Sequence, residues 1–156
     1  MTSRALPPGH YYWDEVRPGD HWSTGTASVT AGAIDRFADL SGDRFEIHMD
    51  DAAARARGFD GRVAHGLLVL SMIDGLKNQA DVQMRAVASL GWDWSFRAPV
   101  LIGHRIRAAI AVKAARATSN PARGILTLGF EVRTQTGDLV QSGTNQLMVS
   151  RQSPAG

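Results

Sequence analysis

The most constraining feature of this sequence is a single helical segment that is apolar on nearly all sides. The other long runs of the chain alternate between apolar and polar residues. From Leu67 to Leu76, apolar residues fall on nearly every side of a helix. A helix of that kind is buried, because no side of it suits water. We therefore expect a helix from about His65 to Lys77 at the centre of the molecule, covered by the rest of the chain.

The remaining long runs alternate between apolar and polar residues with a period of two. They span 106–114, 126–133 and 139–149, and a further strand is expected over 88–96. Such alternation is typical of strands with one buried face and one wet face. The sequence thus predicts an α+β fold, in which a curved antiparallel sheet wraps around the buried central helix.

The first half of the chain is expected to be less regular. A short strand over 22–29 precedes a helix that Thr30 caps and Gly42 ends, and a second short helix closes at Gly58. Residues 41–50 lie between these helices and are polar, so we expect an irregular segment there. Irregular segments on a rigid scaffold are where functional groups tend to lie.

Length and composition exclude several classes of protein. The 156 residues suit one domain over 1–156, with loose ends at about 1–10 and 152–156. The absence of cysteine excludes disulfides and thiolate chemistry. No apolar run approaches the roughly 20 residues that cross a bilayer, so we expect no membrane partner and a cytoplasmic protein. The 17 basic and 15 acidic residues are interspersed, which favours a solvated surface over a nucleic-acid footprint.

The segment S-G-D-R-F-E-I-H-M-D, from Ser41 to Asp50, carries the clearest chemistry. Asp43 and His48 are five residues apart, and a carboxylate and an imidazole together can hold or relay a proton on one water. Taken alone, the pair favours a plain structural interpretation, in which Asp43 caps a turn and His48 packs. The five histidines lack the spacing of metal ligands, and we expect no metal.

The surroundings of this pair resemble a known motif. Residues 41–68 read S-G-D-R-F-E-I-H-M-D-D-A-A-A-R-A-R-G-F-D-G-R-V-A-H-G-L-L. They resemble the hydratase motif of the MaoC-like dehydratase family, the (R)-specific enoyl-CoA hydratases of hot-dog fold. That motif runs roughly G-D-x-N-P-[IL]-H-x-D and then G-F-x-x-[RP]-x-x-H-G. The resemblance extends from about Tyr12 to Val149.

The resemblance implies a hydratase or dehydratase that adds water to trans-2-enoyl-CoA thioesters, giving (R)-3-hydroxyacyl-CoA, or removes it, without metal or redox cofactor. Asp43 would be the general base, and His48 would complete water activation and proton delivery. The Gly66 N–H, at the positive end of the central helix, would face the enolate oxygen that develops in the reaction. Gly66 is also open to a role in close packing alone. Further substrate contacts are assigned to Phe45, Gly61, His65 and Ser71.

One departure from the family pattern keeps other functions open. Phe45-Glu46 stands where the family has Asn-Pro. This replacement favours a non-catalytic acyl-CoA-binding or partner subunit, and an acyl-CoA thioesterase of the same fold is the other alternative. His65 and Ser71 are also open to roles in helix packing. Trp92, Trp94 and Phe96 suit the core or an interface, or an acyl tunnel.

The expected architecture also bears on assembly. A single domain of this kind leaves the edge of its sheet exposed, and an exposed edge invites pairing with another strand. We therefore expect a homodimer with a continuous sheet, or a higher homo-oligomer. His104 stands where the family usually has Asp, and we expect a structural role for it.

Overall fold

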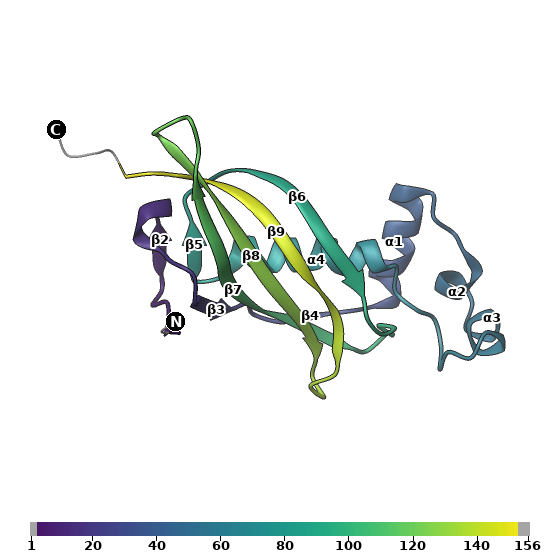
Figure 1. Cartoon of the computed structure of the whole chain (residues 1–156). Helices are drawn as coiled ribbons and strands as arrows, with labels where there is room; N and C mark the ends of the chain where they lie inside the picture. The colour runs from purple at the N-terminus through teal and green to yellow at the C-terminus, as the bar shows by residue number, and fades with distance from the viewer. Residues whose placement is uncertain (1–2, 153–156) are drawn as a thin grey trace.

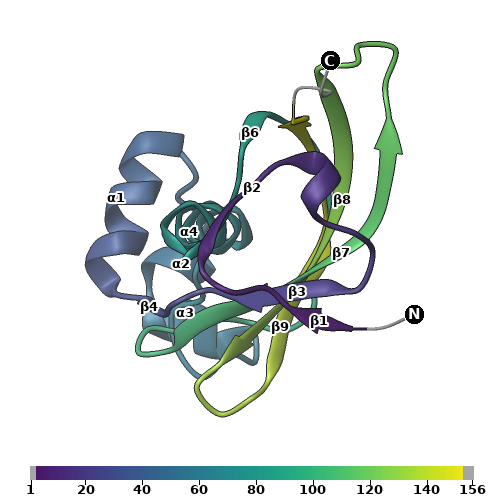
Figure 2. The same cartoon turned by 90° about the vertical axis from the view of Figure 1, so that its left-hand side faces the viewer.

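The computed structural model describes residues 3–152 and places the expected helix against a curved sheet. Helix α4 (Gly66–Gln79) lies across the concave side of the sheet, and the view along its axis shows the strands curving past it (Figures 1 and 2). The sheet order is β1 (Arg4–Ala5), β3 (Asp20–Ser23), β7 (Arg105–Ala117), β8 (Arg123–Thr134), β9 (Leu139–Ser150) and β6 (Ala86–Phe96), with β4 (Ala27–Ser28) also paired with β7.

All pairs in this sheet are antiparallel except β1 with β3, which is parallel. The four long strands β6 to β9 follow the strand runs expected from the sequence. Residues 118–122 join β7 to β8, and residues 135–138 join β8 to β9 through Gly137, which adopts a left-handed φ of 87°. The predicted antiparallel strands late in the chain are confirmed. The predicted α+β class is confirmed with them.

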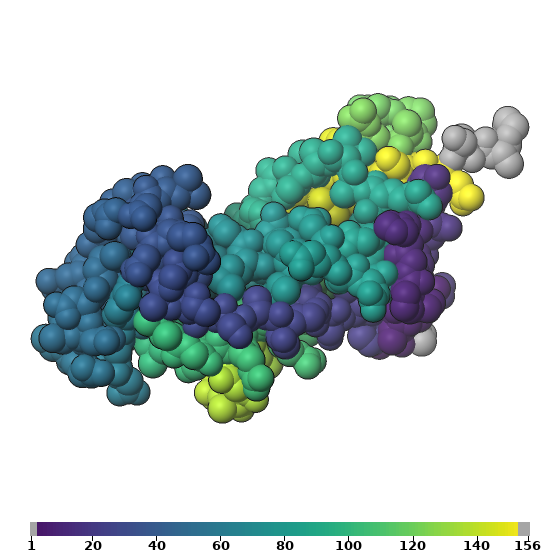
Figure 3. All heavy atoms as spheres, turned by 180° about the vertical axis from the view of Figure 1, so that it is seen from behind, coloured from purple at the N-terminus to yellow at the C-terminus, as the bar shows by residue number. Residues whose placement is uncertain are grey.

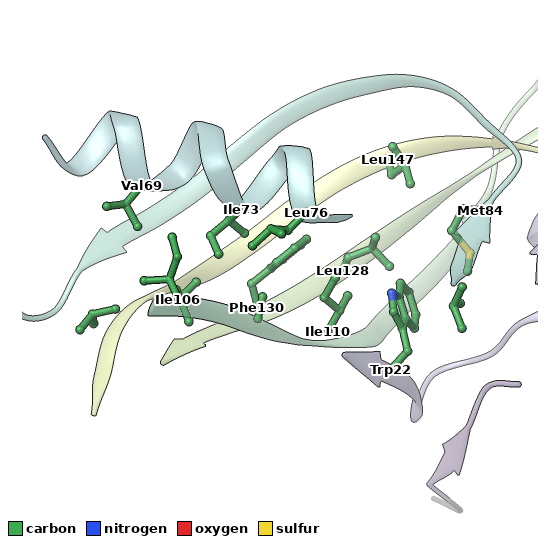
Figure 4. Close-up of a cluster of buried hydrophobic side chains, with 14 of the residues drawn as sticks. Trp22, Val69, Ile73, Leu76, Met84, Ile106, Ile110, Leu128, Phe130 and Leu147 are labelled. Atoms are coloured by element: carbon green, nitrogen blue, oxygen red, sulfur yellow. The ribbon is translucent and has the colours of Figure 1, made fainter. Parts of the chain in front are cut away.

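The core lies between α4 and the inner face of the sheet. Val69 and Ile73 of α4 point toward Ile106 and Ile110 of β7 and toward Phe130 of β8 (Figure 4). All five side chains are buried. Burying one such side chain stabilises the fold by about 1.5–3 kcal/mol relative to leaving it exposed, so this contact holds the helix to the sheet.

One side of α4 is open, which differs from the expectation of a helix covered all round. Leu67 is 59% exposed. Ser71 lies one turn further along the same side and is exposed as well. Viewed from behind, the teal residues of α4 and β6 reach the surface in the middle of the molecule (Figure 3). The helix α4 therefore carries more apolar side chains than the rest of this chain covers.

Three short helices form one end of the molecule (Figure 1). They are α1 (Ala31–Ser41), α2 (Glu46–Met49) and α3 (Asp51–Ala56). The predicted caps are confirmed, since the Ala33 N–H donates to Thr30 Oγ1 and Gly42 ends α1 with a left-handed φ of 80°. The segment expected to be irregular between the helices contains α2, a single helical turn that the sequence pattern is too short to reveal.

The N-terminal segment is ordered, so the expectation of a loose arm is wrong for residues 4–10. β1 joins the main sheet, and β2 (Gly9–Tyr11) pairs in parallel with β5 (Val82–Met84). Arg4 anchors β1, because its guanidinium donates to both carboxylate oxygens of the fully buried Asp20, at 2.9 and 2.6 Å. Residues 1–2 and 153–156, where loose ends were also expected, lie outside the described residues.

The Asp20 carboxylate is an ionised group inside the fold. Burial raises its pKa, but hydrogen bonds from the Arg4 guanidinium and the Arg17 N–H outweigh that effect, so the pKa of Asp20 lies below its ordinary value. The same pair raises the pKa of Arg4. Among residues 3–152, no helix is both long and apolar enough to span a bilayer.

Candidate active site

Asp43, His48 and His65 meet where the segment after α1 approaches the start of α4. One carboxylate oxygen and one ring nitrogen from each histidine lie within 4.8 Å of one another. Asp43 follows the left-handed end of α1, His48 lies on α2, and His65 is the residue before α4. The two residues of the predicted pair therefore face one another, and His65 joins them.

The imidazole of His48 is buried and held in one orientation. Its Nδ1 lies 2.6 Å from the Val63 carbonyl oxygen, and because a carbonyl can only accept, Nδ1 carries the proton. In the neutral ring, Nε2 is then free to accept a hydrogen bond. Arg62 supports this arrangement, since its Nε donates to the His48 carbonyl oxygen at 2.6 Å. The site therefore presents an acceptor nitrogen next to a carboxylate.

Asp43 is exposed in the single chain and shapes the turn on which it sits. Its N–H donates to Ser41 Oγ at 3.1 Å, and its Oδ1 accepts from the Phe45 N–H at 3.2 Å. The turn role expected from the sequence is thus present. One carboxylate oxygen is engaged in that turn, and the carboxylate retains acceptor capacity for a water.

His65 is the most buried of the three, with 2% of its surface exposed. Its Nε2 donates to the Asp43 carbonyl oxygen at 2.8 Å, and its ring stacks on that of His48 with centroids 4.0 Å apart. Phe37 contacts it at a centroid distance of 4.8 Å. Its buried Nδ1 has no hydrogen-bond partner among the described residues. The packing role considered for His65 is therefore present, and it connects the two members of the pair.

A cavity of about 320 Å³ opens beside His48. Gly66, Phe96 and Gln141 line it, together with residues 97–100. Gly66 is the first residue of α4, so its N–H has no partner within the helix. A Cβ at Gly66 would lie 2.5 Å from the Phe96 ring, so the glycine also permits close packing. Both roles considered for Gly66 are compatible with this geometry.

The remaining residues assigned to substrate contact do not line this cavity. The Phe45 ring meets His48 edge to face at a centroid distance of 6.1 Å. Ser71 is exposed and donates to the Leu67 carbonyl oxygen at 2.8 Å, as expected for a helix-packing serine. Gly61 lies beside Asp51, whose Oδ1 would be 3.2 Å from a Cβ there. Outside the site, His104 Nδ1 accepts from the Leu101 N–H at 3.0 Å, which is a structural role.

Gln141 is the site residue that sequence reasoning missed. It is 2% exposed, its Nε2 donates to the Gly66 carbonyl oxygen at 3.1 Å, and its Oε1 accepts from Trp94 Nε1 at 2.8 Å. It therefore ties the first turn of α4 to β6 and β9. The available signal was a long polar side chain inside the alternating run over 139–149.

Glu46, which replaces a proline of the family pattern, has its own partner. Its Oε1 lies 2.6 Å from the Arg57 guanidinium, and that guanidinium also lies over the Phe45 ring, 5.1 Å from its centroid. The two replacement residues are thus held together by one arginine. Asp43, His48 and His65 are the described residues that offer a shared set of ligand atoms for a cation, and the expectation of no metal stays a prediction.

Comparisons with known proteins agree with this arrangement. A family model described as a MaoC like domain matches residues 15–134. The (R)-specific enoyl-CoA hydratase of Aeromonas caviae is 33% identical over 113 residues, which are 72% of this chain and 81% of that protein. Protein MaoC of Klebsiella aerogenes is 36% identical over 109 residues, which are 69% of this chain. Those residues are 32% of MaoC, so the chain spans about a third of that relative.

Solved structures match over nearly the whole chain. The MaoC-like dehydratase from Rhodospirillum rubrum is 25% identical and superposes with a TM-score of 0.84, covering 92% of this chain and 99% of that one. A Mycobacterium tuberculosis protein with a double hotdog fold is 21% identical, with a TM-score of 0.80 over 94% of this chain and 46% of that one. The predicted hot-dog fold is confirmed.

Proposed function

The chain belongs to the MaoC-like domain family, and we propose that it is a hydratase or dehydratase acting on trans-2-enoyl-CoA and (R)-3-hydroxyacyl-CoA thioesters. The observation that carries this proposal is that the Asp43 carboxylate lies close to the His48 ring, and that His48 and Gly66, the first residue of α4, line the same cavity. The relative from Aeromonas caviae supports the reaction class, since its name states that activity.

In the proposed reaction, one water lies between Asp43 and His48. Asp43 accepts one proton of the water as the water oxygen adds to C3 of the enoyl thioester, and the same proton then passes from Asp43 to C2, so that Asp43 ends as a carboxylate again. His48 Nε2 accepts a hydrogen bond from the other hydrogen of the water, which stays on the new hydroxyl group, and so orients the water during addition and proton delivery. The hydrogen bond from His48 Nδ1 to the Val63 carbonyl oxygen supports this role, because it leaves Nε2 free to accept a hydrogen bond from the water. Both new bonds form on one face of the double bond, and the steps reverse for dehydration.

Water addition at C3 places negative charge on the thioester carbonyl oxygen. The Gly66 N–H is the proposed donor to that oxygen, since it lies at the positive end of α4 and its residue lines the cavity. A hydrogen-bond donor aimed at a developing oxyanion in a site without water can lower the activation free energy by about 3–4 kcal/mol. The Gln141 hydrogen bond to the Gly66 carbonyl supports the orientation of that peptide group. No electron is transferred, so the proposal includes no redox cofactor.

The experiment that tests this function follows two signals from the same thioesters. With crotonyl-CoA and longer enoyl-CoA substrates, the ultraviolet absorbance of the conjugated double bond should fall, while no free thiol is released. Chiral analysis of the product should give the (R)-3-hydroxyacyl thioester. Release of free thiol from a saturated acyl-CoA would indicate a thioesterase instead. Binding of the enoyl-CoA without any turnover would indicate the non-catalytic subunit.

We also propose that the chain forms a homodimer through β6 and the open side of α4. β6 is the last strand of the sheet, so its outer edge has no neighbouring strand within the described residues. Val87, Leu90 and Phe96 of this strand are 43%, 49% and 58% exposed. Leu67 of α4 is 59% exposed and follows Gly66, which lies against the Phe96 ring. Pairing two such edges would continue the sheet and bury these side chains.

Sedimentation analysis tests the dimer. The wild-type chain should sediment with twice the mass of one chain. Leu90→Lys should shift the distribution toward the monomer, because it places a charge at the centre of the proposed interface. Leu40→Lys is the matched control, since Leu40 is 86% exposed on α1 and should leave the mass unchanged. A wild-type chain that is monomeric at all concentrations would contradict the proposal.

A further inference from the structure

The convex face of the sheet carries a second cluster of chemistry, away from the site described above. β7 and β8 pair so that Arg107 lies directly opposite Arg133. Arg105 lies two residues before Arg107 on the same face of β7. Like charges directly opposite one another on a sheet are destabilising, so three arginines gathered in this way need a compensating partner.

The chain itself supplies little of that compensation. Within residues 3–152, the Arg105 and Arg107 guanidinium groups have no ion pair and no hydrogen bond. Arg133 is held by the Gly137 carbonyl oxygen at 2.9 Å and by Glu131 at 3.4 Å. The three arginines line a cavity of about 540 Å³, together with Thr26, Thr134 and Gln135.

Next to this cavity the same face has a second hollow, which has small side chains on its floor and Lys113 and Glu131 at its sides. The pair beyond Arg107 and Arg133 is Ala109 with Glu131, and the pair after that is Ala111 with Gly129. Ala109, Ala111 and Gly129 lie on the floor of this hollow of about 450 Å³, which extends across β3, β7, β8 and β9. The Lys113 side chain lies over Gly129 and adds a further cation to its wall. The cationic cavity and this hollow are therefore consecutive along the two strands.

From this placement we infer that the convex face binds a phosphate-bearing ligand of the nucleotide class. Its phosphate groups lie against Arg105, Arg107 and Arg133, and its flat, largely apolar base lies over Ala109 and Ala111. Arginine suits this role, because its planar fork of donors matches phosphate oxygens. Glu131 sits at the boundary between the two parts and weakens the binding of an anion there.

Calorimetric titration of the full chain with ADP, inorganic pyrophosphate and adenosine tests the site at physiological ionic strength. ADP should bind more tightly than pyrophosphate, and adenosine should bind weakly. Arg107→Gln should weaken the binding of ADP and of pyrophosphate about tenfold or more. Glu131→Gln should strengthen both several-fold. Ala109→Leu should weaken the binding of ADP but not of pyrophosphate, because the larger side chain fills the hollow and leaves the arginines in place.

The matched control is Arg116→Gln, which removes the same charge from the far end of β7. It should change the affinity for ADP by less than about twofold, because an exposed charge more than a Debye length away is largely screened. If Arg116→Gln and Arg107→Gln lost affinity for ADP equally, the inference would be overturned, because binding would then depend on the net charge of the protein and not on this site. Absence of ADP and pyrophosphate binding by the wild-type chain would overturn it as well. Thermal melting checks that each variant is folded.

The phosphate can come from a free nucleotide or from the CoA of a bound substrate, and kinetics separate these sources. If it is the CoA, Arg107→Gln raises the KM for crotonyl-CoA and leaves the KM for crotonyl-pantetheine, which lacks the nucleotide, unchanged. If it is a free nucleotide, both KM values stay the same while ADP binding is lost. The binding measurements do not require turnover, so failure of the proposed hydratase activity leaves this test intact.

Discussion

The rings of His48 and His65 stack with their centroids 4.0 Å apart and their planes inclined by 26°. The same His65 donates from Nε2 to the Asp43 carbonyl oxygen. One buried ring therefore contacts both members of the proposed catalytic pair: it fixes the plane of the imidazole and the turn that carries the carboxylate. We regard His65 as a positioning residue on this basis.

Two substitutions at His65 separate these contacts. His65→Phe keeps a ring against His48 but removes the donor to Asp43, whereas His65→Gln keeps a donor and removes the stack. Both should lower kcat by about 10- to 100-fold, since misplacing a catalytic group by about 1 Å costs that much. KM should change little, because His65 is buried away from the cavity lining. A large rise in KM with kcat unchanged would instead assign His65 to substrate binding.

Gly66→Ala should lower activity through Phe96. The new Cβ would lie 2.5 Å from the Phe96 ring, and that ring, which is 58% exposed, is free to move. The displacement changes the cavity that Gly66 and Phe96 both line. We expect a fold that melts within a few degrees of the wild type and a clear loss of kcat/KM for enoyl-CoA. Gly75→Ala on the same helix is the control, because a Cβ there meets only the Gln79 side chain at 4.0 Å.

Phe45→Asn should raise both stability and turnover. Phe45 is the N-cap of α2 and makes no capping hydrogen bond, whereas asparagine is a favoured N-cap residue worth about 1 kcal/mol. Because the Phe45 ring meets the His48 ring edge to face, we expect an amide at this position to reach the Asp43–His48 pair. Phe45→Ala removes the ring without adding a donor and should not increase the rate. Equal rates in the two variants would show that the amide contributes nothing to catalysis.

The buried Asp20 predicts a contribution to stability that depends on pH. In the unfolded chain its carboxyl titrates near the ordinary value of 3.8, and in the folded protein its pKa is lower. The unfolded state therefore binds more protons in acid, so this contribution is fully present above pH 3.8 and is lost as pH falls through the folded pKa. Asp20→Asn should destabilise the protein by about 1–3 kcal/mol near pH 7.

Denaturant unfolding of wild type and Asp20→Asn at several pH values measures this effect. The difference in the free energy of unfolding between the two proteins should shrink as pH falls below 3.8. A difference that stays constant from neutral pH to below pH 3.8 would show that the charge of Asp20 does not contribute. The Asp39 carboxylate, which pairs with Arg44 at the surface, provides a control, and Asp39→Asn should show little difference at any pH.

Three of the long strands were predictable because each alternates with a period of two over eight or more residues, and the central helix was predictable because its residues are apolar on nearly every side. The pair Asp43 and His48 was found through its spacing and motif. Gln141 was not, because a polar residue inside a strand reveals its partners only when β9 is placed beside α4. The strands at Arg4 and Gly9 were missed for a similar reason, since two or three residues carry no period and are held by distant partners such as Asp20. The open side of α4 was missed because apolar composition does not distinguish burial within one chain from burial between two.

The most direct test of the central claim is the turnover of crotonyl-CoA by Asp43→Asn, followed by ultraviolet absorbance beside wild type and Asp39→Asn. Asp39 lies on the same end of the molecule, so the control removes an equal charge nearby. We predict that wild type and Asp39→Asn consume the enoyl thioester and that Asp43→Asn is slower by about 10²–10⁴-fold while melting normally. An Asp43→Asn protein as fast as wild type, or a wild type inactive at every chain length, would contradict the account.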